Sequence, residues 1–215
     1  MSKSITLLGG TFDPVHNGHL RIARAAQAHC AADEVWFVPA GDPWQKTVKP
    51  LAAEVRLNML ELALADTAGW RIEKSEVGRT GPSYTIDTLE RLRTQHPADT
   101  FTLIIGADQA QRLPSWHRWR ELFAHVRIGI VSRDGYPDTL PTALQPYFDA
   151  NRLIRVPMPT VAVSSTDIRQ LVPLLAHELP SVAQTARQKL MRLLPPPVWR
   201  FIEENALYSG KLTNG

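Results

Sequence analysis

"SITLLGGTFDPVHNGHLRIARAAQAHC", residues 4–30, passes from a short apolar run through paired glycines into a segment with helical periodicity. The run at 4–10 is typical of a buried strand that ends in a loop. After it, Leu20, Ala23 and Ala26 recur at the spacing of one helix face. The stretch therefore predicts a strand, a glycine-containing turn and a helix, which together begin a βαβ unit.

The same alternation continues along the chain. We expect further strands at 34–40, 70–79, 100–108, 127–133 and 152–158, and helices at 51–66, 83–96, 113–126, 164–178 and 198–208. Ser83 is the expected N-cap of the helix at 83–96. Such alternation predicts an α/β fold with a parallel sheet covered on both faces. We expect a single domain over 1–215, with a small helical part at about 165–208.

Composition excludes several classes of protein. The 215-residue chain is 44% hydrophobic and 21% charged, which is ordinary for a globular fold with a sizeable core. Its net charge is +3 and its pI about 9.2, without a run of like charges typical of a nucleic-acid-binding tail. Cys30 is the only cysteine, which fits a reducing compartment. No apolar run approaches the roughly 18 residues of a membrane span, and the opening lacks signal-peptide features, so we expect a cytoplasmic protein.

The turn after the first strand has the chemistry of a phosphate site. Open α/β folds place ligands at the carboxyl ends of their strands, and Gly9 and Gly10 allow a ligand to approach the backbone closely. His16 and His19 are three residues apart, so they share a helix face. A helix start favours anions, and imidazole N–H groups donate to phosphate oxygens. The stretch therefore predicts a cradle for a phosphate chain.

Alternatives for the two histidines are a metal site and an ordinary structural role. A metal pair lacks a third ligand at the usual spacing nearby. The dinucleotide fingerprint G-x-G-x-x-G and the P-loop pattern are both absent. Ordinary surface or core histidines would explain one imidazole more readily than the whole string.

A second anion site is predicted at "VSSTDIRQL", residues 163–171. Ser164 or Ser165 would cap a helix there, and Arg169 is suited to bridging two phosphate oxygens. Alone, the segment would indicate a capped helix with a surface arginine. Beside the histidine motif, a second phosphate grip is favoured.

These motifs resemble a known superfamily. "GGTFDPVHNGH" and "SSTDIR" resemble the nucleotidyltransferases with an HxGH motif and a downstream ISSTxIR motif, whose first position is Val163 here. "SYTIDTL" at 83–89, "IIGADQ" at 104–109 and "LPSWHRW" at 113–119 look like the nicotinate-nucleotide adenylyltransferases in particular, as does "PPPVWRFIEENALY" near the C-terminus. The resemblance covers about residues 4–208.

The resemblance implies a Rossmann-like fold and one reaction of NAD biosynthesis. Nicotinate mononucleotide attacks the α-phosphorus of ATP in line, giving deamido-NAD and pyrophosphate, and Mg²⁺ accompanies the phosphates. The catalytic residues implied are His16, His19, Lys46 and Arg169. The ATP-binding residues implied are Gly9, Gly10, Thr11, Phe12, Arg133, Ser165 and Thr166.

The resemblance also implies an acceptor site for nicotinate mononucleotide. Its residues would be Asp13, Tyr84, Thr85, Asp108 and Trp116. Thr85 and the backbone near Tyr84 would read the nicotinate carboxylate, and Trp116 would stack on the pyridine ring. Packing could equally explain Trp116, and capping of the next helix could explain Asp108.

Three rival functions remain open at this point. Another superfamily member would use nicotinamide mononucleotide, phosphopantetheine or a phosphorylated alcohol as its acceptor. A nucleotide sensor would keep the fold without the chemistry, and an RNA-binding protein would account for the basic pI. The sequence does not settle the oligomeric state and is compatible with a homo-oligomer.

Overall fold

The structure, a computed structural model, describes residues 1–41, 49–79, 81, 83–131, 139–158 and 163–209. Its chain divides into two units. The sheet unit comprises Met1–Thr11, Arg21–Lys49 and Thr67–Val161, and the helical unit comprises Phe12–Leu20, Pro50–Asp66 and Ala162–Gly215. Each is described separately below, and the single domain over 1–215 stays a prediction.

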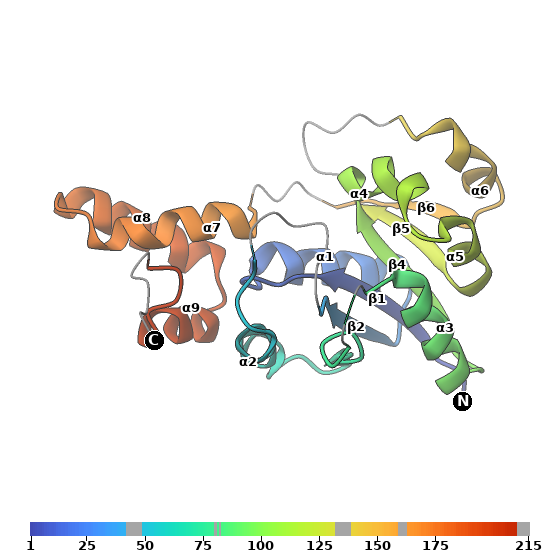
Figure 1. Ribbon diagram of the computed structural model, residues 1–215, viewed down its shortest axis with the longest axis horizontal. Helices are drawn as coiled ribbons and strands as arrows, with labels where there is room; N and C mark the ends of the chain where they lie inside the picture. The colour runs from blue at the N-terminus through green and yellow to red at the C-terminus, as the bar shows by residue number, and fades with distance from the viewer. Residues whose placement is uncertain (42–48, 80, 82, 132–138, 159–162, 210–215) are drawn as a thin grey trace. The chain divides into compact units, whose positions relative to one another are not determined.

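The sheet unit is built on six parallel strands in the order β3-β2-β1-β4-β5-β6 (Figure 1). The strands are β1 Ser4–Gly10, β2 Glu34–Pro39, β3 Trp70–Ile72, β4 Thr100–Gly106, β5 Arg127–Val131 and β6 Leu153–Val156. The strand order reverses between β1 and β4, which is the switch point where folds of this class place their ligands. The predicted α/β parallel sheet is confirmed.

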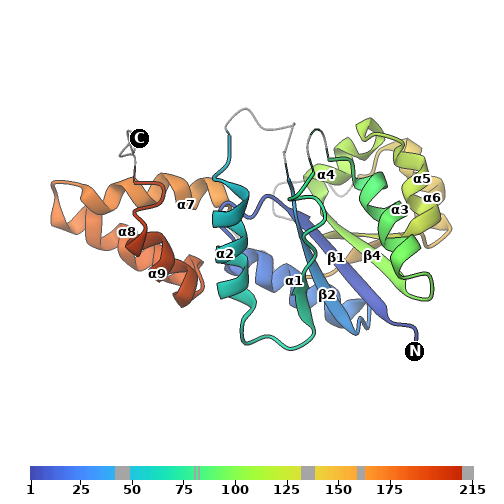
Figure 2. The same ribbon diagram turned by 60° about the horizontal axis from the view of Figure 1, so that its bottom comes forward.

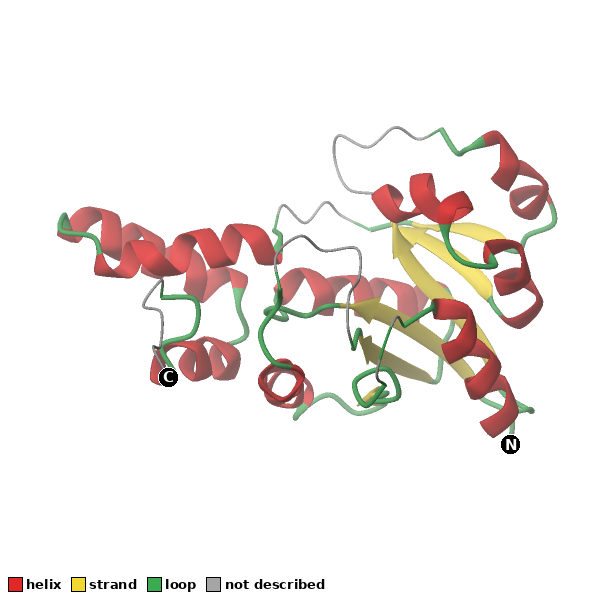
Figure 3. Cartoon of the chain, viewed as in Figure 1, coloured by secondary structure: helices red, strands yellow, loops and turns green. Residues whose placement is uncertain are grey.

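Nine α-helices lie within the described residues (Figure 3). They are α1 Asn17–His29, α2 Ala53–Leu64, α3 Thr85–Gln95, α4 Ala107–Arg112, α5 Trp119–His125, α6 Gln145–Asp149, α7 Ser165–Leu171, α8 Pro180–Leu193 and α9 Pro196–Glu204. Short 3-10 helices cover Leu113–Ser115, Thr142–Leu144 and Val172–Ala176. None of the described helices is long and apolar enough to cross a membrane.

The sheet carries helices on both faces. On one face Leu7, Leu103 and Ile130 pack in a single buried cluster with Leu89 of α3 and Leu122 of α5. Figure 2 shows α3 lying along the strands. Crossovers between parallel strands are right-handed, and the β1–α1–β2 connection runs across the sheet in the opposite direction to β3–α3–β4. Consequently α1 lies on the face opposite to α3.

The helical unit has its own apolar contacts. Its helix α2 packs against α9, and α8 packs against both the 3-10 helix Val172–Ala176 and α9. Buried side chains such as Met59 of α2, Leu190 of α8 and Ile202 of α9 line these contacts. The small C-terminal helical part expected at about 165–208 is therefore present as α7, α8 and α9.

Three local predictions were wrong. The strand expected at 70–79 ends at Ile72, because the chain then turns, with Val77 N donating to the carbonyl of Lys74. Tyr84, not Ser83, occupies the N-cap position of α3. The helix expected at 113–126 is split, because Arg118 adopts a left-handed backbone conformation just before α5.

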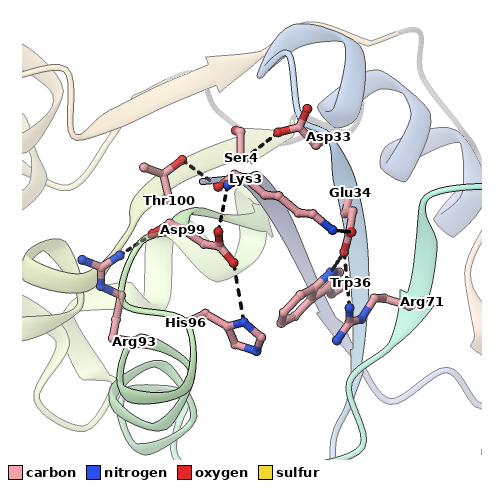
Figure 4. Close-up of polar contacts among 10 residues, drawn as sticks. All are labelled: Lys3, Ser4, Asp33, Glu34, Trp36, Arg71, Arg93, His96, Asp99 and Thr100. Carbon is pink, nitrogen blue, oxygen red and sulfur yellow. Dashed lines mark hydrogen bonds and ion pairs between the residues drawn. The ribbon is translucent and has the colours of Figure 1, made fainter. Parts of the chain in front are cut away.

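The amino edge of the sheet is fastened by polar side chains (Figure 4). Lys3 N donates to Oδ1 of Asp99 at 2.8 Å, and the Lys3 ammonium pairs with Glu34. Trp36 Nε1 donates to the second oxygen of Glu34 at 2.7 Å. These four residues, Lys3, Glu34, Trp36 and Asp99, form the amino-edge cluster, which joins the chain at the starts of β1, β2 and β4.

Candidate active site

The turn after β1 leads directly into the histidine motif. Phe12 and His16 are each 1% exposed, and Phe12 has a positive φ of 52°. The backbone N–H of His19 donates to the carbonyl of His16 at 2.9 Å, which forms the first turn of α1. A buried turn thus fixes the backbone on which both imidazoles stand.

The two imidazoles lie together, as the sequence predicts. Their rings stack with centroids 3.8 Å apart, and Phe12 meets the His19 ring edge-on at 5.0 Å. The backbone N–H of His16 donates to Nδ1 of His19 at 3.2 Å. A neutral imidazole that accepts at Nδ1 carries its proton at Nε2. His19 therefore can donate an Nε2–H hydrogen bond to an anion.

Gly18 makes this pairing possible, although the sequence analysis did not single it out. A Cβ at this position would lie 2.7 Å from Cγ1 of Val163 and 2.9 Å from the His16 ring. Its only sequence signal is its place inside the string His16-Asn17-Gly18-His19. At Gly9, by contrast, an added Cβ meets nothing within 4 Å, so close approach of a ligand to Gly9 stays a prediction.

Two adjacent serines at the start of α7 have different hydrogen-bond partners. Ser164 Oγ accepts from the Asp167 backbone N–H at 3.1 Å, and Ser164 N donates to Oδ2 of Asp167 at 2.9 Å, which is a capping box. Of the two predicted caps, Ser164 is therefore the one used. Ser165 Oγ instead donates to the carbonyl of Pro14 at 3.0 Å, which fastens α7 to the histidine turn.

Arg169 is held against the same turn. One terminal nitrogen of Arg169 donates to the carbonyl of Asp13 at 2.7 Å and lies 3.8 Å from the Asp13 carboxylate. Its other terminal nitrogen donates to Oγ1 of Thr166 at 3.1 Å. The side chain of Arg169 is 27% exposed. The helical unit thus brings the histidine turn together with Ser165, Thr166 and Arg169.

Asp13 is the buried centre of this arrangement. The residue is 5% exposed, and Tyr208 donates its hydroxyl proton to Oδ1 of Asp13 at 2.8 Å. Arg56, 1% exposed, donates from Nε to the carbonyl of Leu51 at 3.0 Å. Burial lowers the pKa of Arg56, and the charge of Asp13 opposes that shift. Arg56 and Tyr208 were not predicted, since no local sequence pattern connects either residue to Asp13.

In the sheet unit, the ends of β1 and β4 meet at one edge. The strands are parallel neighbours with Leu8 opposite Ile104, so Gly10 and Thr11 lie at the same carboxyl edge as Asp108. Asp108 is not the N-cap of α4, because Gly106 holds that position and Asp108 is the second residue of the helix. Its carboxylate instead folds back over Gly106, where Oδ1 would lie 2.5 Å from an added Cβ.

The other predicted acceptor residues lie at the start of α3 and in the segment before α5. Tyr84 is the N-cap residue of α3, Thr85 is its first residue, and the Tyr84 ring lies 4.4 Å from the ring of His117. Trp116 is partly buried, with no partner found for its Nε1 among the described residues. Trp119 is the core member of the tryptophan pair at 7% exposure.

Two predicted site residues fall outside the part of the chain that the structure describes. They are Lys46 and Arg133. Within the part of the chain that the structure describes, no group of three His, Cys, Asp or Glu side chains could hold a metal ion. The described protein groups therefore do not form a metal cage of their own.

Comparisons with known proteins agree with this architecture. A model of the cytidylyltransferase-like family matches residues 7–171. A probable nicotinate-nucleotide adenylyltransferase of Methylibium petroleiphilum is 38% identical over 96% of this chain and 93% of its own. A protein of the same description from Dechloromonas aromatica is 38% identical over 97% of this chain and 99% of its own.

A solved structure shares the fold. Plasmodium falciparum nicotinic acid mononucleotide adenylyltransferase complexed with NaAD superposes with a TM-score of 0.70, at 20% identity over 96% of this chain and 97% of that one. This likeness confirms the Rossmann-like arrangement, and the sequence relatives supply the family. The chain therefore belongs to the cytidylyltransferase-like family and, within it, to the nicotinate-nucleotide adenylyltransferases, which are nucleotidyltransferases.

Proposed function

We propose that this chain transfers the adenylyl group of ATP to nicotinate mononucleotide in NAD biosynthesis, releasing pyrophosphate. Full-length similarity to nicotinate-nucleotide adenylyltransferases supports the reaction. The single structural observation that carries the proposal is the histidine turn, where the rings of His16 and His19 stack and where Arg169 of α7 donates to the carbonyl of Asp13. It combines aligned imidazoles with a guanidinium that is only partly exposed, which suits a polyphosphate.

The chemistry is an in-line displacement at phosphorus. A phosphate oxygen of nicotinate mononucleotide forms a bond to the α-phosphorus of ATP, while the bond from that phosphorus to the bridging oxygen of the β-phosphate breaks. The electron pair leaves with pyrophosphate. No covalent enzyme intermediate is needed, so the protein acts by positioning the reactants and stabilising charge.

Five residues of the helical unit have proposed roles in this step. The Nε2–H of His19, oriented by the contact at Nδ1, donates to the α-phosphate as charge builds there, and His16 fixes the plane of the His19 ring. Arg169, with Ser165 and Thr166, holds the β- and γ-phosphates as they leave. Lys46 and Arg133 stay proposed contacts of ATP, as do Gly9, Gly10, Thr11 and Phe12.

The acceptor would be bound mainly by the sheet unit. Thr85 and Tyr84 at the start of α3 offer a hydroxyl and backbone groups to the nicotinate carboxylate. Trp116 offers its indole face to the pyridine ring. Asp108, at the carboxyl edge, is placed to accept from ribose hydroxyls. Asp13 stays a proposed member of the acceptor site, although its carboxylate is bound to Tyr208 and paired with Arg169.

Mg²⁺ is proposed to enter with ATP, bound mainly by phosphate oxygens, as this hard ion prefers. It would supply neutralisation of phosphate charge. The cytoplasmic location and a homo-oligomeric assembly stay predictions.

Pyrophosphate release with ATP and Mg²⁺, measured with nicotinate mononucleotide and then with its amide, tests the proposal. We expect release with the acid and at least a hundredfold lower kcat in His19→Ala, since removal of one donor to a developing charge costs about 10²–10³. We expect His16→Ala, which removes the ring that holds His19 in its plane, to lower kcat by a comparable factor. His29→Ala, at the exposed end of the same helix, is the matched control and should leave the rate unchanged.

The alternatives predict other results. A preference for the amide would keep the mechanism and contradict the roles of Thr85 and Trp116. Release with neither acceptor would contradict the proposed reaction and favour a different phosphorylated acceptor or a sensor. Salt-sensitive retention of RNA would favour the RNA-binding alternative.

A further inference from the structure

Tyr208, in the last described turn of the chain, has a strained backbone conformation. After α9, the backbone N–H of Leu207 donates to the carbonyl of Ile202 at 3.1 Å, and Tyr208 adopts a φ of 61°. A bulky residue in the left-handed region is strained and persists only where its surroundings fix it. The Tyr208 hydroxyl donates to Asp13, a contact that ties this residue to the histidine turn.

That hydrogen bond belongs to a series of contacts that runs from Tyr208 through Asp13 to Arg169. Tyr208 donates to Oδ1 of Asp13, and the other carboxylate oxygen lies 3.8 Å from Arg169. The carbonyl of the same Asp13 accepts from Arg169 at 2.7 Å. Burial, followed by the charge of Asp13, raises the pKa of the Tyr208 hydroxyl, which therefore stays a protonated donor.

The charges in this group favour an anion at Arg169. Arg56 and Arg169 each carry a positive charge, and Asp13 carries one negative charge, so the three groups together have one positive charge in excess. Arg56 is fully buried, whereas Arg169 is partly exposed, so the excess is accessible at Arg169. The contacts to Asp13 and Thr166 use two of the five N–H groups of Arg169, and the others can donate to phosphate.

We propose that Tyr208 is a positioning residue for adenylyl transfer, because its hydroxyl fixes the Asp13 carboxylate and thereby the orientation of Arg169 toward the leaving pyrophosphate. This inference rests on the proposed function. The Tyr208 hydrogen bond occupies one side of the Asp13 carboxylate, which limits how far that carboxylate turns toward Arg169. Without the hydroxyl, the carboxylate turns to Arg169 for its missing donor and competes with the phosphates for the guanidinium.

The test is steady-state kinetics of Tyr208→Phe, which removes only the hydroxyl. We expect kcat/KM for ATP to fall about tenfold, which is roughly 1.4 kcal/mol, with the KM for nicotinate mononucleotide changed less than twofold. The affinity for inorganic pyrophosphate, measured by calorimetry without turnover, should fall by a similar factor. Tyr147→Phe, a partly buried tyrosine packed on Phe123 in the sheet unit, is the matched control and should change neither quantity.

A double mutant separates positioning from a general effect on folding. In an Arg169→Lys background, Tyr208→Phe should change kcat/KM for ATP less than twofold, because lysine lacks the fork that Asp13 orients. If Tyr208→Phe gives no folded protein, Asp13→Asn takes its place, since it keeps an oxygen acceptor for Tyr208 and removes the charge facing Arg169. Because no carboxylate then competes for Arg169, Asp13→Asn should keep the affinity for pyrophosphate within twofold of wild type or raise it, and a tenfold loss would contradict the competition.

Distinct outcomes overturn the two proposals. Wild-type protein that releases no pyrophosphate contradicts the proposed function. An active wild type with Tyr208→Phe losses that are absent, equal for both substrates, or fully additive with Arg169→Lys contradicts the positioning role alone.

Discussion

Alanine at position 18 would place one methyl group against two side chains at once. Its Cβ would lie 2.7 Å from Cγ1 of Val163 and 2.9 Å from Cε1 and Nδ1 of His16. Carbon atoms at van der Waals contact are about 3.5–4.0 Å apart, so each neighbour must retreat by roughly 0.6–1.3 Å. His16 is 1% exposed and Val163 is 6% exposed, so neither has solvent to move into.

The expected cost has a stability component and a catalytic component. Overpacking of a tight site costs about 1–3 kcal/mol, which corresponds to a fall in Tm of roughly 2–12 °C for a chain of this size. Because the His16 ring stacks on His19, its displacement moves the proposed phosphate donor as well. A misplacement of about 1 Å in a reacting group costs up to roughly a hundredfold, so kcat should fall about ten- to a hundredfold.

Thermal unfolding and pyrophosphate release of Gly18→Ala measure both components. The control is Gly78→Ala, because an added Cβ there meets nothing within 4 Å, and it should be neutral in both assays or slightly more stable. Val163→Ala in the Gly18→Ala background should restore part of the stability, since it removes one of the two clashes. A Gly18→Ala protein with wild-type Tm and rate would refute the steric argument.

Two further predictions concern pH. The Lys3 hydrogen bond, then Trp36 and neighbouring positive charges, outweigh partial burial and lower the pKa of Glu34 below its ordinary 4.5. The ionised Glu34 carboxylate therefore stabilises the fold above its unfolded pKa, and this stability is lost as pH falls through its folded pKa. Urea unfolding should show Glu34→Gln less stable than wild type at pH 7, with the difference shrinking below about pH 4. Burial raises the pKa of Glu76, so its ionised form opposes folding as pH rises. Glu76→Gln, which keeps an acceptor for the Thr88 hydroxyl, should be more stable than wild type at pH 8 and not at pH 4, and equal stability at both would contradict this.

Local patterns predicted the elements that determine the fold. Residues 4–10 and 17–30 correspond closely to β1 and α1, because strand burial and helix periodicity are properties of neighbouring residues. The helix predicted at 113–126 is interrupted at Arg118, where no glycine or proline indicates an interruption. The strand predicted through residue 79 failed because apolar spacing alone does not show where a sheet edge ends.

The candidate site was predictable only in part, for the same physical reason. His16, His19 and Arg169 lie in short motifs; in the structure the two imidazoles stack, and Arg169 of α7 donates to the carbonyl of Asp13 in the same turn. Tyr208 contacts Asp13 across 195 positions of sequence, and a contact of that kind follows from tertiary packing. The choice between Ser164 and Ser165 as cap was likewise decided by the position of Pro14, which attracts the second hydroxyl.

The amino-edge cluster has a consequence for how this sheet can change over time. It ties the starts of β1, β2 and β4 by charged and indole groups at the edge away from the predicted acceptor residues. Strand registration is therefore secured without help from the loops that follow the strands. Those loops can accumulate substitutions that alter which acceptor is chosen, while the scaffold keeps its alignment. The carboxyl edge of the sheet can therefore tolerate mutation, while the amino edge maintains the fold.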